Sequence, residues 1–114
     1  MKHVFSIVDE LGIMDYNTTP STVYNDAVNE LSEGVALSKK VTIGLETIDL
    51  TSYGGGNGSV SFWTTSCSAL NSAVASIYSS VASASQASAF SRFAIHAFWD
   101  DKNGVLSGYK NLCP

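Results

Sequence analysis

The sequence predicts an α/β fold in which three short strands lie parallel and are joined by amphipathic helices. The first observation is the order along the chain, where strand-like and helical segments alternate, as in parallel sheets with right-handed crossovers. The second is the composition, 45% hydrophobic and only 14% charged, which excludes a long disordered chain. We expect one domain over residues 1–114. It would be a partial (β/α)8 barrel, because a complete barrel needs roughly 250 residues.

The first unit combines a strand with a helix that is well marked at its start. Residues 4–16 are apolar, with the strongest strand character at residues 11–14. Thr19 can act as a helix N-cap, and Pro20 suits the first helical position, where the missing N–H costs nothing. Apolar residues then recur along one helical face, at Val23, Ala27, Val28, Leu31 and Val35. This spacing predicts a helix with one buried stripe that ends near Lys39 and Lys40.

The second unit begins with a short strand over residues 41–45. This run is nearly continuous in apolarity, which is typical of a strand buried on both faces. A glycine-rich segment follows over residues 52–59, and no Lys comes after it as a phosphate-binding loop requires. We therefore expect a loop over a cleft, followed by a brief extended or hairpin-like piece at residues 60–63.

The third part contains a second helix, a third strand and a short closing helix. Ser66 or Ser68 can cap the second helix, whose apolar positions are spaced by four, three and four residues at Leu70, Val74, Ile77 and Val81. Residues 93–99 predict the third strand. We expect a turn that begins at Asp100 and Asp101, and the closing helix within residues 104–112.

Charge and composition exclude several kinds of partner. The net charge is -4 and no basic cluster occurs, so the chain lacks the cationic surface that nucleic acid requires. No apolar run reaches the ~18 residues of a membrane span. Asp9 and Glu10 interrupt the apolar N-terminal stretch too early for a signal peptide. The domain could still be secreted as part of a longer precursor, and its localisation stays unknown at this level.

The two cysteines and the remaining motifs give no metal or redox site. Cys67 and Cys113 are too few for a zinc site and too far apart for a CxxC motif. Two idle thiols are the favoured interpretation, and a disulfide in an oxidising compartment is the alternative. The sequence also lacks the HExxH and GxSxG patterns. We expect no metal.

Polar and aromatic side chains follow the carboxyl end of each predicted strand. In parallel α/β folds these ends meet at one rim and carry the working residues. The candidates are Met14, Asp15, Tyr16 and Asn17 after the first strand, Glu46 after the second, and His96, Trp99 and Asp100 at the third. Asp15 and Glu46, on neighbouring strand ends, could form the carboxylate pair of a glycosidase. The alternative is that they are rim residues with hydrogen-bonding roles.

The run Met14-Asp15-Tyr16-Asn17 resembles the Met-x-Tyr-Asp/Asn signature on the sixth strand of glycoside hydrolase family 18, the chitinase-like barrels. Trp99 falls where that family has a Trp at its last strand, so the chain would span strands six to eight. The resemblance implies that Tyr16 holds the substrate acetamido group, that Asp15 assists, and that Trp99 forms the sugar-binding floor. It also implies that no cofactor is used. The family's Asp-x-x-Asp-x-Asp-x-Glu motif does not occur here.

These observations lead to one main functional hypothesis and two alternatives. The chain would be the C-terminal portion of a glycoside hydrolase-like barrel that acts on or binds polysaccharide and is inactive alone. The first alternative is a non-catalytic carbohydrate-binding module. The second is a structural half-barrel that self-associates, because exposed strand edges seek partners. The expected partners are accordingly a carbohydrate, a second copy of the chain, or the missing half of the barrel.

Overall fold

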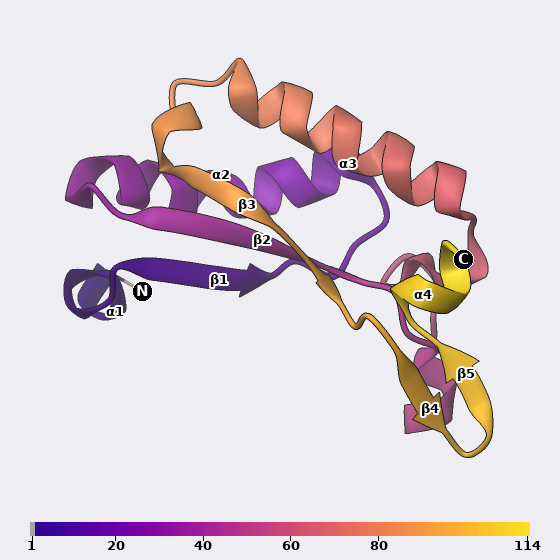
Figure 1. Cartoon of the computed structure of the whole chain (residues 1–114). Coiled ribbons are helices and arrows are strands. Elements are labelled where there is room, and N and C mark those ends of the chain that lie inside the picture. The colour runs from indigo at the N-terminus through magenta and orange to yellow at the C-terminus, as the bar shows by residue number, and fades with distance from the viewer. Residues whose placement is uncertain (1) are drawn as a thin grey trace.

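The computed structural model describes residues 2–114 and has an α/β architecture. Its sheet contains β1 (Glu10–Met14), β2 (Lys40–Glu46) and β3 (Phe90–His96), all parallel and in the order β1-β2-β3. Two long helices connect them, α2 (Pro20–Leu37) and α3 (Cys67–Ala82), as Figure 1 shows. The predicted parallel sheet and the alternation of strands with helices are confirmed.

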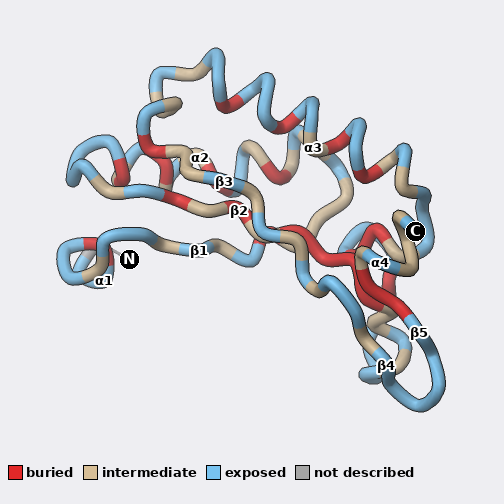
Figure 2. The backbone as a smooth tube through the Cα atoms, in the orientation of Figure 1, coloured by how far each residue is buried: buried red, intermediate tan, exposed pale blue. Residues whose placement is uncertain are grey.

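Both long helices cover the same face of the sheet. β2 turns three fully buried side chains toward them, Val41, Ile43 and Leu45. Most of the predicted apolar stripes are buried, which comprise Val23, Ala27 and Leu31 in α2 and Leu70, Ile77 and Val81 in α3. Figure 2 shows these buried positions on the inner sides of the helices and along β2. The core therefore lies between the sheet and the two helices, and no helix among residues 2–114 covers the opposite face of the sheet. The expectation that residues 41–45 form a strand buried on both faces is thus wrong, because Thr42 and Gly44 on the uncovered face are only partly buried. Val28 and Val74 are only partly buried, and the expectation that Val35 belongs to the buried stripe is wrong, because it is exposed near the end of α2.

Thr19 and Ser66 are the N-caps of the two helices, but only Ser66 makes a side-chain capping hydrogen bond. Thr19 has extended backbone before Pro20, and its N–H donates to the Asn17 side-chain oxygen. Ser66, rather than Ser68, is the N-cap of α3, because its hydroxyl accepts the N–H of Ala69. α2 ends at Leu37 through a left-handed residue, so the two following lysines lead into β2 instead of ending the helix.

Short elements at the N-terminus and after β2 differ from the prediction. Helix α1 (Lys2–Ile7) precedes β1 and was not predicted, since its six residues are too few to show a helical period. Its Phe5 is fully buried in the core and fixes α1 against α2. Two 3₁₀ helices, Leu50–Tyr53 and Phe62–Thr64, replace part of the expected loop and the extended piece after it.

The predicted boundaries after β3 are wrong. β3 begins and ends three residues early, at Phe90 and His96. A hairpin of β4 (Asp100–Lys102) and β5 (Val105–Ser107) follows, and only then the short helix α4 (Tyr109–Leu112). The two residues between β4 and β5 both have positive φ, which is the geometry of a tight hairpin turn. Figure 1 shows this hairpin extending away from the sheet.

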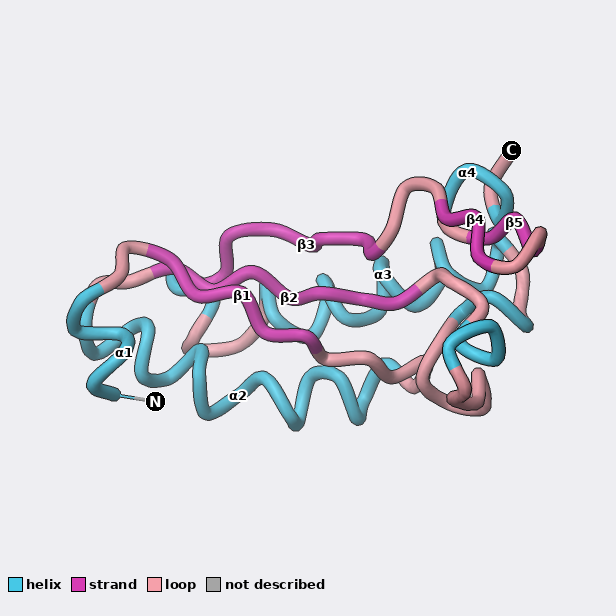
Figure 3. The backbone as a smooth tube through the Cα atoms, turned by 90° about the horizontal axis from the view of Figure 1, so that it is seen from below, coloured by secondary structure: helices cyan, strands magenta, loops and turns pink. Residues whose placement is uncertain are grey.

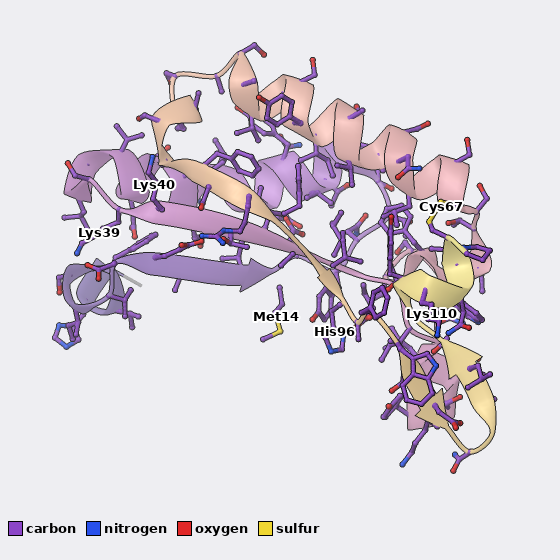
Figure 4. All side chains as sticks on the ribbon, in the orientation of Figure 1. Met14, Lys39, Lys40, Cys67, His96 and Lys110 are labelled. Atoms are coloured by element: carbon purple, nitrogen blue, oxygen red, sulfur yellow. A yellow bond between two sulfur atoms is a disulfide. The ribbon has the colours of Figure 1, made fainter. Side chains whose placement is uncertain are left out.

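Cys67 and Cys113 form a disulfide, so the favoured interpretation as idle thiols is wrong. The bond joins the first residue of α3 to the residue that follows α4. Figure 4 labels Cys67 beside the C-terminal segment. The two cysteines are 46 residues apart in the sequence, so no local pattern could predict that they are close in space. Disulfides persist in oxidising compartments.

Candidate functional site

Glu46 and His96 form a hydrogen-bonded pair at the carboxyl ends of β2 and β3. The parallel register places the two residues side by side. His96 Nδ1 lies 3.0 Å from Glu46 Oε1 and 2.9 Å from Oε2. Glu46 is only 2% exposed, and its Oε1 also accepts the backbone N–H groups of Thr47 and Ile48. Because those N–H groups require an acceptor, the carboxylate is the acceptor of the pair, and Nδ1 of His96 donates to it.

This pairing orients the imidazole of His96. With Nδ1 held by the buried carboxylate, the second ring nitrogen, Nε2, is directed away from Glu46. The His96 side chain is 54% exposed, so Nε2 is accessible to a ligand. Many general bases have this arrangement, in which a carboxylate binds Nδ1 of a histidine and leaves Nε2 free for the ligand. Glu46 itself is too enclosed to contact a ligand, and its role here is to position His96.

Tyr16 stacks on the same imidazole. The ring centroids of Tyr16 and His96 are 6.1 Å apart, with an angle of 23° between the planes. Burial raises the pKa of the Tyr16 hydroxyl, and the nearby charge of Glu46 raises it further. The hydroxyl therefore stays protonated at neutral pH and is available as a hydrogen-bond donor.

A cavity of about 360 Å³ lies beside this group on the helix-free face of the sheet. Its floor consists of small residues, Gly12, Gly44 and Ala94, one from each strand. Met14, which is 78% exposed, lines its wall. Figure 4 shows Met14 and His96 together below the sheet, on the side opposite the helices, and Figure 3 views the sheet from that side. The cavity brings together Met14, Tyr16 and His96 of the predicted site.

Thr47, which follows Glu46 among the polar residues at the end of the second predicted strand, supports this site. Its N–H and its hydroxyl both donate to the backbone oxygen of His96, at 2.6 and 2.9 Å. Its own carbonyl accepts the N–H of Gly108, which begins the turn into α4. Thr47 is fully buried and thereby locks the end of β3 to the end of β2. Only the tertiary structure reveals this role, because the partners are about 50 residues away along the chain.

Asp15 lies in different surroundings from Glu46. It follows Ile13 by two residues, so strand alternation directs it to the helix side. There it lines a second cavity with Asp26 and Glu30 of α2. Burial raises its pKa to about 6, and the negative charges of Asp26 and Glu30 add to the effect. The structure thus does not bring Asp15 and Glu46 together as a carboxylate pair around one cavity.

The other predicted residues do not line this cavity, and two of them, Asn17 and Asp100, have local partners. The Asn17 side-chain oxygen accepts the N–H of Thr19 at 2.8 Å and shapes the turn before α2. Trp99 is 51% exposed in the loop after β3, not on the strand. Asp100 begins β4, where its Oδ1 accepts the Tyr53 hydroxyl at 2.7 Å. Trp99 and Asp100 therefore belong to the base of the hairpin.

Two further structural findings concern the part of the chain that the structure describes. Among residues 2–114, no group of three or more His, Cys, Asp or Glu side chains is arranged to hold a metal ion. None of the helices described is both long enough and apolar enough to cross a membrane. Comparison of the chain with protein-family models, with curated proteins and with solved structures finds no match.

Proposed function

We propose that this chain forms the last three βα units of a (β/α)8 barrel that binds carbohydrate, with His96 and Tyr16 as the ligand-contacting groups. The observation that carries the proposal is the Glu46–His96–Tyr16 group at the carboxyl ends of adjacent parallel strands, beside an open cavity. Ligand sites of barrels lie at this end of the strands.

The sheet topology supports the barrel part of the proposal. The strands follow one another in chain order, β1-β2-β3, and both crossover helices lie on one face. A doubly wound sheet instead changes direction and places helices on both faces. In a barrel the helix-free face would be the interior, and the small floor residues Gly12, Gly44 and Ala94 leave room there for side chains from other strands.

The chemistry of the group suits a polyhydroxylated ligand. The oriented His96 can accept or donate a proton at Nε2, and the protonated Tyr16 hydroxyl can donate to a carbonyl or hydroxyl oxygen. Phe98 and Trp99, which are 66% and 51% exposed, follow His96 after one intervening residue, Ala97. Exposed aromatic rings stack on the apolar faces of sugars for the same reason that other apolar surfaces leave water. Glu46 acts through His96 as a positioning residue.

The proposal is tested by titrating the purified chain with a chitooligosaccharide and following backbone amide resonances by NMR. We expect weak binding, on the order of a millimolar Kd, with the largest shifts at Tyr16 and His96. His96→Gln should abolish the binding. His3→Gln, at an exposed histidine of α1, is the matched control and should retain it. Absence of any shift at millimolar ligand would contradict the carbohydrate proposal.

Hydrolysis is tested separately with a chromogenic chitooligosaccharide. The chain lacks the family's acidic motif, so we expect no turnover. Measurable turnover that His96→Gln abolishes would contradict the proposal that the chain is inactive alone. Trp99→Ala should reduce binding without changing the fold, because Trp99 is half exposed.

Self-association is the second candidate function, and one observation favours it. Among the described residues, β1 and β3 pair only with β2, each on one side, so both edges of this sheet are open for another strand. The apolar Met14 is also largely exposed. Light scattering with size-exclusion chromatography measures this property directly. Dimers without sugar affinity would favour a structural half-barrel over carbohydrate binding, whereas a stable monomer would exclude self-association.

A further inference from the structure

The second cavity lies on the helix side of the sheet, at the carboxyl end of β1. It has a volume of about 240 Å³ and is lined by Ile13, Met14 and Asp15 together with Asp26 and Glu30. The i, i+4 spacing places Asp26 and Glu30 on the same side of α2. Three carboxyl groups therefore share one cavity, and none of the residues that line it is basic.

Asp15 is the enclosed member of this group. It is only 9% exposed, and its Oδ2 has no hydrogen-bond partner among residues 2–114. A buried carboxylate oxygen without a donor is unfavourable, and evolution rarely leaves one unsatisfied. The pKa of Asp15 is raised to about 6, mainly by burial and then by Asp26 and Glu30. The cavity thus lacks a positively charged hydrogen-bond donor.

The cavity opens beside an unpaired strand edge. β1 pairs with β2 along one side, and no strand within the described residues pairs with its other side. Such an edge presents free N–H and C=O groups that can bind another strand. In strand addition, the main-chain bonds supply affinity and pockets for alternate side chains supply specificity. Ile13 and Met14 belong both to this edge and to the cavity wall, so an added strand would pass beside the cavity.

We propose that the outer edge of β1 binds an extended partner segment, and that an arginine of this segment enters the cavity and pairs with Asp15. Arginine suits the site because its planar guanidinium has five donors and pairs with carboxylates in a bidentate manner. A metal ion does not suit it, because the acidic side chains are not arranged as a coordination site. The net charge of -4 also favours the approach of a cationic segment. The two cavities lie on opposite faces of the sheet, although Ile13 and Met14 line both of them. The inference does not rest on carbohydrate binding, and in the proposed barrel the partner segment would be the neighbouring strand at this edge.

The test uses two synthetic peptides of alternating Val and Thr that differ only at one central residue, Arg or Gln. Each is titrated into the whole chain and followed by amide NMR at pH 7.5. We expect the Arg peptide to bind about tenfold more tightly or better, with shifts along β1 and at Asp15. Asp26 and Glu30 are the acidic groups that face Asp15, and together with burial they raise its pKa to about 6. The preference for the Arg peptide should therefore shrink at pH 5, because Asp15 is then protonated and carries no charge to pair with arginine.

Two variants separate specific pairing from general attraction. Asp15→Asn should bind both peptides equally, whereas Asp101→Asn, at an exposed acid in β4, should keep the preference for Arg. Two results with the unaltered chain would each overturn the proposal: equal binding of the two peptides, or no binding of either peptide. Self-association of the chain that Asp15→Asn abolishes would also overturn it, since a second copy would then occupy the edge.

Discussion

Replacing Asp15 by Asn should stabilise the chain at neutral pH but not in acid. Asp15 has a pKa raised from 3.8 to about 6, chiefly by burial. A raised folded-state pKa means that, between these values, the folded chain binds more protons than the unfolded chain. The contribution of Asp15 to the free energy of unfolding therefore falls as the pH rises from about 4 to about 6, and it stays low above that window. Asn has the same shape as the protonated acid but never ionises.

The size of the effect follows from the same values. Each pH unit between the two pKa values corresponds to about 1.4 kcal/mol, so the ionised Asp15 costs roughly 3 kcal/mol at pH 7.5. The advantage of Asp15→Asn should thus be near zero at pH 4 and approach this value at pH 7.5. Urea unfolding followed by circular dichroism at the two pH values measures both.

Two further variants distinguish this explanation from a general effect of removing negative charge. Glu30→Gln removes one of the two neighbouring charges and should give a smaller gain in the same direction. Asp101→Asn removes an exposed charge from β4 and should change the stability by less than about 0.5 kcal/mol. If Asp15→Asn raised the free energy of unfolding equally at pH 4 and pH 7.5, this would refute the assignment of Asp15 as a buried carboxyl group whose ionised form destabilises the fold.

Three other variants test how the site is supported. Cys113→Ser opens the disulfide with Cys67, which spans 46 residues, and should lower the free energy of unfolding by roughly 4 kcal/mol; an unchanged urea midpoint under oxidising conditions would contradict the pairing. Asn57→Ala removes a buried amide that accepts the N–H of Leu50 and donates to a carboxylate, and urea unfolding should show a loss of about 1–3 kcal/mol. Gly108→Ala places a Cβ 2.8 Å from a backbone oxygen at a φ of 97°, so its melting temperature should fall, whereas a melt matching that of the parent chain would exclude this strain.

The helices and strands of the core were predictable because their signals are local. The spacing of apolar residues in α2 and α3 reports which side of each helix is buried, and that spacing is visible within 18 residues. The apolarity of residues 41–45 identified the strand but not its surroundings, because it predicted burial on both faces and only one face is fully buried. Parallel topology then placed the polar residues after β1, β2 and β3 at one end of the sheet, as the sequence predicted.

The errors occur where short segments depend on distant contacts. Helix α1 is too short to show a period and depends on burial of Phe5 in the core. The hairpin of β4 and β5 contains three residues on each side, so it offers little alternation to read. The position of Asp15 was predictable in principle, because it lies two residues after Ile13 and thus on the helix side.

The sequence by itself determined the alternation of strands and helices, the buried stripes and the set of polar residues at the strand ends. These depend on periodicity and composition, which each segment carries on its own. The tertiary structure decided which of those residues meet: His96 with Glu46 and Tyr16, Asp15 with the acids of α2, and Cys67 with Cys113. The physical reason is that strand register and the face toward which each side chain points are set only when the whole sheet packs against its helices.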